Sequence, residues 1–217
     1  MQTPRLYRCS VSRTQRERRE TTIAKLLDAS IEIIDELGYA RASVTNITAR
    51  AGLSYGALFR HFPTMSDFMA ATAHEAVRRQ VEATRKRFRE VAGRAGRTDM
   101  ETSLEVLREL AGRPTHTAIL ELTMAARTDP FLRASLQQAM RDVGPLMIET
   151  AREMVGHETD LGYDDAITLV FMVSDLFDSE VFQRPLREPH PRSNTRRVAL
   201  LLRMLEPFGR RAVDPAE

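Results

Sequence analysis

The chain has few of the residues that mark secreted or membrane proteins. It contains a single cysteine, Cys9, so no disulfide can form within it. No apolar run approaches the roughly 20 residues that cross a bilayer. The N-terminal stretch is basic and lacks the apolar segment of a secretory signal. These absences together predict a cytoplasmic protein in a reducing compartment, with no membrane partner.

The chain also lacks the residue patterns that usually accompany catalysis or metal binding. Its five histidines are scattered, and it has no HExxH motif, no Cys/His cluster and no glycine-rich phosphate loop. The sequence therefore predicts no catalytic residues, no metal ligands and no cofactor. An enzyme remains the competing class, because a Ser-His-Asp arrangement built only by tertiary contacts leaves no such pattern.

Acidic and basic residues nearly balance, and the formal net charge is only +2. The charge is nevertheless unevenly distributed along the chain. Residues 1–62 carry ten basic and six acidic side chains, a net +4, which leaves −2 for the rest. A basic N-terminal part on a near-neutral body predicts a polyanionic partner at that end of the molecule.

No segment shows the alternation of a strand, and apolar residues recur at helical spacing along the whole chain. We therefore expect an all-α protein of about nine helices. Gly38 is placed to end the first of them, and Ser43 and Ser54 are placed to cap the second and third. The expected helices cover residues 14 or 20–37, 44–51, 55–61, 64 or 66–91, 99–111, 115–127, 130–155, 160–183 and 194–208.

Residues 43–62 have the pattern of two short helices joined by a tight turn. Ile47 and Leu58 supply apolar contacts between the helices, and Gly52 stands where the turn needs a left-handed backbone. Small and hydroxylated residues on the second helix suit entry into the major groove of DNA. The residues predicted to contact DNA are Ser43, Thr45, Ser54, Tyr55, Gly56, Ala57, Phe59, Arg60, His61 and Thr64. For His61, packing under the next helix is the alternative.

A longer string of residues is more specific than a bare helix-turn-helix: Val44, Ile47, Ala51-Gly52-Leu53-Ser54, Gly56, Leu58-Phe59-Arg60-His61-Phe62 and Phe68. It resembles the DNA-binding domain of the TetR family of transcriptional regulators. The resemblance implies a homodimer whose recognition helices, about 34 Å apart, read a near-palindromic operator on double-stranded DNA. Family members commonly have Tyr at the position of Phe59 and Lys at that of Met65, and both often contact phosphates. Here the arginine-rich N-terminal residues either supply such contacts or form a disordered arm.

We divide the chain into an N-terminal arm (residues 1–19), a helix-turn-helix domain (20–65), a helical ligand-binding and dimerisation domain (66–210) and a tail (211–217). The last two helices are apolar on more than one face, so each must bury more than one face. One face then packs within the subunit and another against a partner, in a four-helix interface. Burial of both faces within a monomer is the alternative. The residues predicted at the dimer interface are Leu169, Val173, Val198, Leu201, Leu202 and Leu205.

The helices between these two regions are expected to enclose a cavity. Methionine and phenylalanine side chains adapt to irregular apolar shapes, and aspartates among them offer polar anchors. The predicted lining residues are Leu104, Leu107, Met124, Met140, Met147, Phe171, Met172, Asp175, Phe177 and Asp178. The alternatives are that the apolar residues form plain core and that the aspartates lie at the dimer interface or in solvent.

The sequence thus predicts a ligand-responsive DNA-binding regulator. The resemblance favours a repressor that binds its operator as a homodimer and is released by a small, mostly apolar effector of unknown identity. The effector is expected to favour a dimer geometry whose recognition helices no longer fit adjacent grooves, with the fourth helix as the lever. A DNA-binding regulator without a small-molecule ligand, or an activator, remains the alternative.

Overall fold

The computed structural model describes residues 14–95, 100–155, 162–186 and 193–205. Cys9, most of the expected N-terminal arm and the tail lie outside the described residues. Every regular element in the described part of the chain is helical, as expected for an all-α fold. None of the helices described there is long and apolar enough to cross a membrane.

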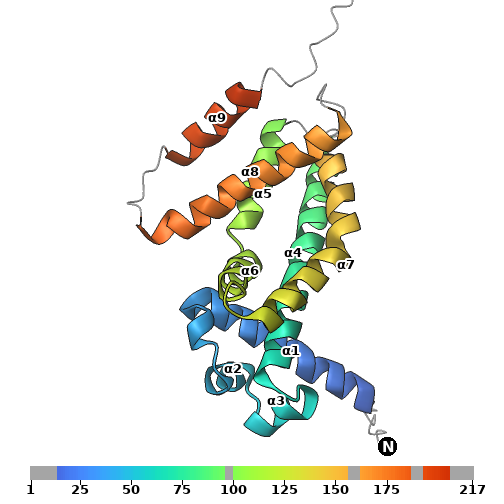
Figure 1. The fold of residues 1–217 in the computed structure, drawn as a ribbon. Coiled ribbons are helices and arrows are strands. Elements are labelled where there is room, and N and C mark those ends of the chain that lie inside the picture. Colours follow the sequence, from blue (N-terminus) through green and yellow to red (C-terminus); the bar gives the residue numbers. More distant parts are fainter. Residues whose placement is uncertain (1–13, 96–99, 156–161, 187–192, 206–217) are drawn as a thin grey trace, which may run out of the picture.

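Nine α-helices and two short 3-10 turns make up the described part of the chain. Helices α1 to α3 form one end of the molecule, and α5, α8 and α9 form the other (Figure 1). The long helices α4 and α7 run side by side between the two ends. The elements are α1 (Gln15–Leu37), η1 (Tyr39–Arg41), α2 (Val44–Ala51), α3 (Tyr55–His61), α4 (Met65–Ala95), α5 (Met100–Ala111), α6 (Pro114–Ala125), α7 (Pro130–Val155), α8 (Tyr163–Gln183), η2 (Arg184–Leu186) and α9 (Ser193–Leu205).

Local capping sets where the first helix begins and ends. The Thr14 hydroxyl accepts the Glu17 N–H, and the Glu17 carboxylate accepts the Thr14 N–H at 2.8 Å, which makes a capping box. Residues 15–19 therefore belong to α1, so these five residues of the expected arm are helical. Gly38 ends the helix with a φ of 81°, a conformation that residues with a Cβ rarely adopt.

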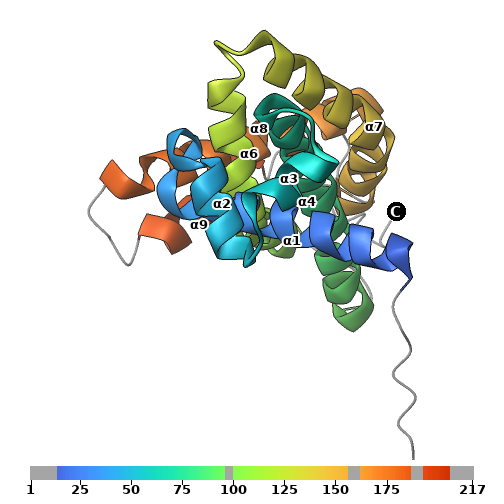
Figure 2. The same ribbon diagram turned by 90° about the horizontal axis from the view of Figure 1, so that it is seen from below.

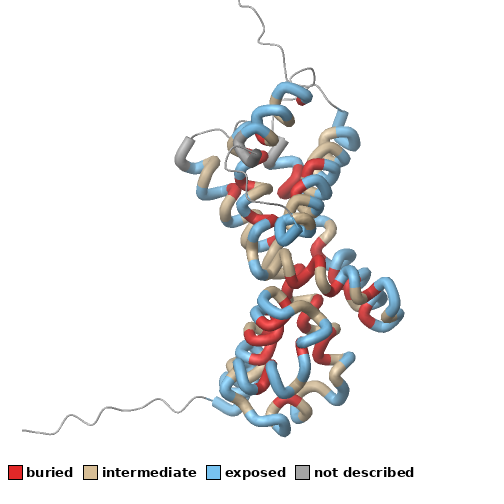
Figure 3. The backbone as a smooth tube through the Cα atoms, turned by 90° about the vertical axis from the view of Figure 1, so that its left-hand side faces the viewer, coloured by how far each residue is buried: buried red, intermediate tan, exposed pale blue. Residues whose placement is uncertain are grey.

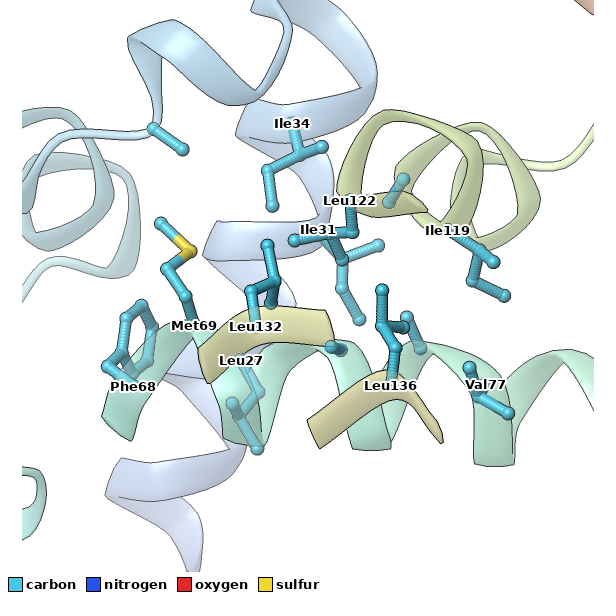
Figure 4. Close-up of a cluster of buried hydrophobic side chains, with 14 of the residues drawn as sticks. Leu27, Ile31, Ile34, Phe68, Met69, Val77, Ile119, Leu122, Leu132 and Leu136 are labelled. Carbon is cyan, nitrogen blue, oxygen red and sulfur yellow. The ribbon is translucent and has the colours of Figure 1, made fainter. Parts of the chain in front are cut away.

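The main hydrophobic core crosses the boundary expected at residue 65. Figure 4 shows side chains from α1, α4, α6 and α7 meeting in one cluster. Ile34 of α1 and Leu122 of α6 are fully buried in it, together with Leu132 of α7. In Figure 3 the buried residues continue through the narrow middle of the molecule. Because α6 and α7 share a close-packed core with α1, continuous packing joins the two ends of the molecule.

A second, smaller core joins α5 to the last two helices. Leu104 of α5 is buried against Val173 and Phe177 of α8, and Val198 and Leu205 of α9 complete the cluster. This packing fixes which faces of α8 and α9 point inward.

Candidate DNA interface and ligand cavity

Helices α2 and α3 form the helix-turn-helix at the lower end of Figure 1, and Figure 2 shows it from below. Gly52 ends α2 in the left-handed conformation, with a φ of 64°. The Ser54 hydroxyl accepts the Ala57 N–H and so caps α3. Leu58 is fully buried, which turns the opposite side of this short helix outward. Both helices have the bounds expected from the sequence.

Seven of the ten residues predicted to contact DNA are exposed: Ser43, Thr45, Ser54, Tyr55, Gly56, Arg60 and Thr64. Among them Tyr55 is 63% exposed. A Cβ at Gly56 would meet no atom within 4 Å, so the fold itself does not require glycine there. The outer side of α3 thus combines a phenol, a guanidinium and bare backbone, which suits close contact with bases and phosphates.

Three other predicted contact residues are half-buried, namely Ala57, Phe59 and His61. Phe59 packs against the main core, and its ring lies 4.7 Å from that of Tyr55. Phe59 is therefore only partly accessible to DNA. The reason is helical geometry, because Phe59 directly follows the buried Leu58 and shares part of its inward side.

Thr64 has a structural task in addition to any contact with DNA. Its hydroxyl accepts the Asp67 N–H at 3.0 Å, and its own N–H donates to the Asp67 carboxylate at 3.1 Å. This reciprocal capping starts α4 and makes Thr64, not Ser66, the residue before the helix. Ser43 caps α2 in the same way, since its hydroxyl accepts the Asn46 N–H.

Basic side chains gather where α1 passes α3. Burial, the Arg19 guanidinium and the Arg60 guanidinium together lower the pKa of the His61 imidazole. Arg19 lies on α1 and belongs to the arginine-rich N-terminal residues for which phosphate contacts were one of two expectations. Arg50, in contrast, is held by α1, with its two terminal nitrogens 2.9 and 2.5 Å from the Glu36 carboxylate. This bidentate pairing lowers the pKa of Glu36 and leaves Arg50 engaged within the protein.

A cavity of about 480 Å³ lies between α4, α5, α6, α7 and α8. Seven of the ten predicted residues line it: Leu107, Met140, Met147, Phe171, Asp175, Phe177 and Asp178. Most of the wall is apolar. Its ionisable residues are the two aspartates and His116, whose Nε2 lies 2.6 Å from Asp178 Oδ1. A space of this size and lining suits a small organic molecule.

The other three predicted lining residues lie elsewhere. Leu104 is buried in the second core, and Met124 and Met172 are exposed, at 47% and 64%. On α8 the lining residues are Val170, Phe171, Ser174, Asp175, Phe177 and Asp178. Met172 is excluded because each step along an α-helix turns the side chain by about 100°.

The wall contributed by α4 is not indicated by the sequence. It consists of Val77, Gln80, Val81 and Thr84. Their spacing of three and four residues is typical of any helix face that packs inward, so no pattern separates cavity from core. His116 is missed for a different reason, because its pairing with Asp178 joins residues 62 positions apart. Within the described ranges, no group of three or more His, Cys, Asp or Glu side chains is placed to hold a metal ion.

The residues predicted at the dimer interface pack inside the subunit. Leu169, Val173, Val198, Leu201, Leu202 and Leu205 all belong to the second core. Different apolar residues of α8 and α9 are turned to solvent, namely Met172, Leu176, Leu200 and Met204, each between 47% and 64% exposed. These helices are apolar on several sides, and packing against α5 decides which side is covered within the subunit. Which residues meet a second subunit stays a prediction.

Helix α6 contacts both the cavity and the DNA-binding end. His116 lines the cavity, while Leu122 packs in the main core beside α1. The Glu121 carboxylate accepts the Tyr39 N–H at 3.0 Å and thereby reaches the turn that joins α1 to α2. A displacement of α6 would therefore act directly on the segment that leads into the helix-turn-helix.

Residues 26–72, which include this helix-turn-helix, match the family model described as bacterial regulatory proteins, tetR family. An uncharacterised HTH-type transcriptional regulator of Mycobacterium tuberculosis is 40% identical over 195 residues, which are 90% of this chain and 98% of that protein. The HTH-type transcriptional regulator CymR of Pseudomonas putida is 27% identical over 161 residues, 74% of this chain and 78% of CymR.

The fold agrees with these relatives. The crystal structure of a transcriptional regulator from Saccharomonospora viridis in complex with choline has a TM-score of 0.61 and 21% identity. The match covers 91% of this chain and 100% of that one. The function of such proteins is regulatory and not enzymatic. The chain belongs to the TetR family of DNA-binding transcriptional regulators.

Proposed function

We propose that the protein is a homodimeric repressor that leaves its operator when a small, mostly apolar effector fills the cavity. One observation carries this proposal: helices that line the cavity also share the main core with α1, directly behind the helix-turn-helix. The cavity of about 480 Å³ has a mostly apolar wall with a few polar groups, which is the kind of site that a small organic molecule fills.

Each subunit offers one α3 to the operator. Tyr55 and Arg60 are exposed on α3, and Thr45 is exposed on the neighbouring α2; all three provide hydrogen-bonding groups for bases and phosphates. Arg19 lies near His61 and adds positive charge for the phosphate backbone. Two copies of this surface, related by a two-fold axis, would read half-sites about one turn of duplex apart.

The exposed apolar face of α8 and α9 supports the dimer. Four large side chains, Met172, Leu176, Leu200 and Met204, are in contact with water in the isolated subunit. Burying such a patch against a second copy removes apolar surface from water, and the two-fold arrangement buries the same patch on both subunits. The interface proposed now uses these residues in place of the six predicted from the sequence.

The coupling between the cavity and DNA runs through α6 as well as α4. Both helices line the cavity, and α6 holds the turn after α1 through Glu121. An effector that binds better when α6 is displaced would shift the population of dimers toward a geometry that does not fit the operator. A coupling free energy of about 1–3 kcal/mol is sufficient for a large change in operator affinity.

A regulator of this kind acts in the cytoplasm, where it meets the chromosome. Whether it represses or activates depends on where its operator lies relative to the promoter, and repression is the mode that release by an effector explains most directly.

Selection of bound duplexes from a random DNA library, followed by fluorescence-anisotropy titration, tests the proposal. We expect a near-palindromic site with half-sites about 10 base pairs apart, bound by two subunits. Arg60→Ala should weaken binding, while Arg133→Ala, an exposed arginine on α7, should not. A broad panel of small molecules should contain some that lower operator affinity. Failure to enrich any sequence, or indifference of the complex to the entire panel, would refute the proposal.

A further inference from the structure

The charged residues that line the cavity restrict the class of ligand that can bind there. The inference about this class rests on the effector-binding function proposed above. The only ionisable residues among those lining the cavity are His116, Asp175 and Asp178. Among the residues that the structure describes, no lysine or arginine contributes to the wall. With both carboxylates ionised, the wall carries a net charge of −1 when His116 is protonated and −2 when it is neutral. The cavity is therefore negative in either state.

The neutral polar side chains of the wall already donate their hydrogens within the protein. The hydroxyls of Thr84, Thr150 and Ser174 donate to carbonyls of their own helices at 2.8, 2.8 and 2.9 Å. The Gln80 amide nitrogen donates to a carbonyl of α5 at 3.1 Å. The three hydroxyl oxygens keep lone pairs for a ligand, whereas the Gln80 oxygen already accepts the Thr115 hydroxyl. The neutral donors left on the wall are the second N–H of the Gln80 amide and the Thr123 hydroxyl. The wall is rich in acceptors and poor in donors.

The described wall of this cavity offers an anionic ligand neither a lysine nor an arginine to pair with. The first turn of α6 lies next to Asp178, but the N–H groups of His116 and Thr117 already donate to the Arg113 carbonyl, at 2.9 and 3.0 Å. A carboxylate or phosphate placed there would be repelled by two aspartates, and His116, the group that can carry positive charge, is already engaged by Asp178. The same arrangement favours a ligand that carries positive charge and hydrogen-bond donors.

The position for this charge is beside Asp175. Asp178 is engaged by His116, whereas Asp175 is exposed and has no hydrogen-bond or ion-pair partner among the residues that the structure describes. The two carboxylates are three residues apart on one face of α8, where like charges repel. Phe171 lines the same face one turn earlier, and an aromatic ring attracts a cation over its face.

We propose that the cavity binds an amphiphilic amine, with the protonated amino group at Asp175 and the apolar body against the methionines and the α4 wall. The ammonium group supplies the donors that the wall lacks and offsets the repulsion between the two aspartates. The chain or ring of the ligand is held only by apolar contacts, so the charged group decides the class of ligand.

Three probes with the same ten-carbon chain test the charge preference: decylamine, 1-decanol and decanoate. Isothermal titration calorimetry at pH 7, below the concentrations at which the probes aggregate, measures each affinity. We expect decylamine to bind about tenfold more tightly than 1-decanol, because it adds one charge-assisted contact, and decanoate to bind most weakly.

A pair of matched variants locates the charge. Asp175→Asn keeps the shape of the side chain and removes its charge, and it should bring the affinity for decylamine down to that for 1-decanol. Asp165→Asn removes the same charge from an exposed position in the first turn of α8, outside the cavity, and should leave the preference unchanged. An unchanged affinity for 1-decanol in both variants shows that the cavity is intact.

Equal binding of the three probes, tighter binding of decanoate, no binding of decylamine, or a preference that survives in Asp175→Asn would each overturn the inference. Operator binding is measured on the same proteins without any probe. Intact operator binding with no preference for the amine rejects this inference alone, whereas absence of operator binding rejects the proposed function.

Discussion

Gly56 is a residue whose identity matters to DNA and not to the fold. A Cβ at this position would meet no atom of the protein within 4 Å. Gly56→Ala should therefore raise the free energy of unfolding, by up to about 1 kcal/mol, since alanine is the better helix former. The added methyl group would stand between α3 and the groove, so we expect operator affinity to fall about tenfold. Thermal unfolding and fluorescence anisotropy measure the two effects separately.

Gly93→Ala is the matched control for this variant. Gly93 is an exposed glycine of α4 with equally open surroundings, so alanine should stabilise the helix there without changing operator affinity. If Gly56→Ala binds the operator as tightly as the unaltered protein, close approach of α3 to the groove is refuted.

The pKa of the His61 imidazole should change when operator DNA binds, because the phosphates of the DNA backbone lie near the ring in the proposed complex. Burial, followed by Arg19 and Arg60, holds the pKa of its imidazole below the ordinary 6.5. Because the folded-state pKa is the lower one, the contribution of His61 to stability is complete above pH 6.5 and is lost as the pH falls through the folded-state pKa. Operator phosphates favour the protonated ring, so DNA should raise this pKa and bind more tightly as the pH is lowered.

NMR titration of the His61 ring protons, with and without operator, measures the pKa in each state. His61→Gln should abolish the part of the pH dependence of operator affinity that this group causes. A pKa that stays the same when DNA is added would place His61 away from the phosphate backbone and favour its role as a packing residue under α4.

At the scale of elements, α6 lines the cavity and also contacts the turn that precedes the helix-turn-helix. The Glu121 carboxylate accepts the Tyr39 N–H at 3.0 Å, so Glu121→Ala removes a partly buried contact with the turn after α1. We expect a loss of about 1 kcal/mol in stability and faster hydrogen exchange of the Tyr39 amide. Any ligand-induced change in operator affinity should become smaller.

Glu149→Ala provides the comparison for this variant. It breaks the contact between Arg85 of α4 and Glu149 of α7, at 3.2 Å, and leaves the turn after α1 untouched. Exchange of the Tyr39 amide should then keep its original rate. Equal exchange rates in Glu121→Ala and the unaltered protein would show that this hydrogen bond does not hold the turn.

At the scale of the whole molecule, the exposed apolar face of α8 and α9 should decide the oligomeric state. Met204 is 62% exposed, so Met204→Glu should leave the subunit folded while placing a charge in the proposed interface. Sedimentation equilibrium at micromolar concentration should show monomers, and operator affinity should fall because each monomer contacts only one half-site. The experiment also tests the reassignment of the interface to the exposed residues.

Met124→Glu is the matched control, because Met124 is 47% exposed on α6, away from α8 and α9. This variant should remain a dimer. A dimer that persists in Met204→Glu would contradict the proposed interface.

The sequence predicted features that depend on neighbouring residues more accurately than features that depend on packing between separate helices. The bounds of α2 and α3 were predicted correctly because Ser43, Ser54 and Gly52 act on backbone groups within a few residues. Seven of the residues expected around the cavity do line it, whereas Met172 of α8 is exposed and does not. Their role in ligand binding stays a prediction. A residue-by-residue pattern does not show which of two apolar faces meets a neighbour.

The amino-acid sequence by itself determined the helices, their caps and the surface that α3 offers to DNA, because these depend on interactions within one or two turns of the chain. Only the tertiary structure decided that α5 covers the inner faces of α8 and α9, that α4 completes the cavity wall and that His116 meets Asp178. Those outcomes depend on packing between segments far apart in the chain. Several helices have more than one apolar face, and close packing against other helices determines which face is buried.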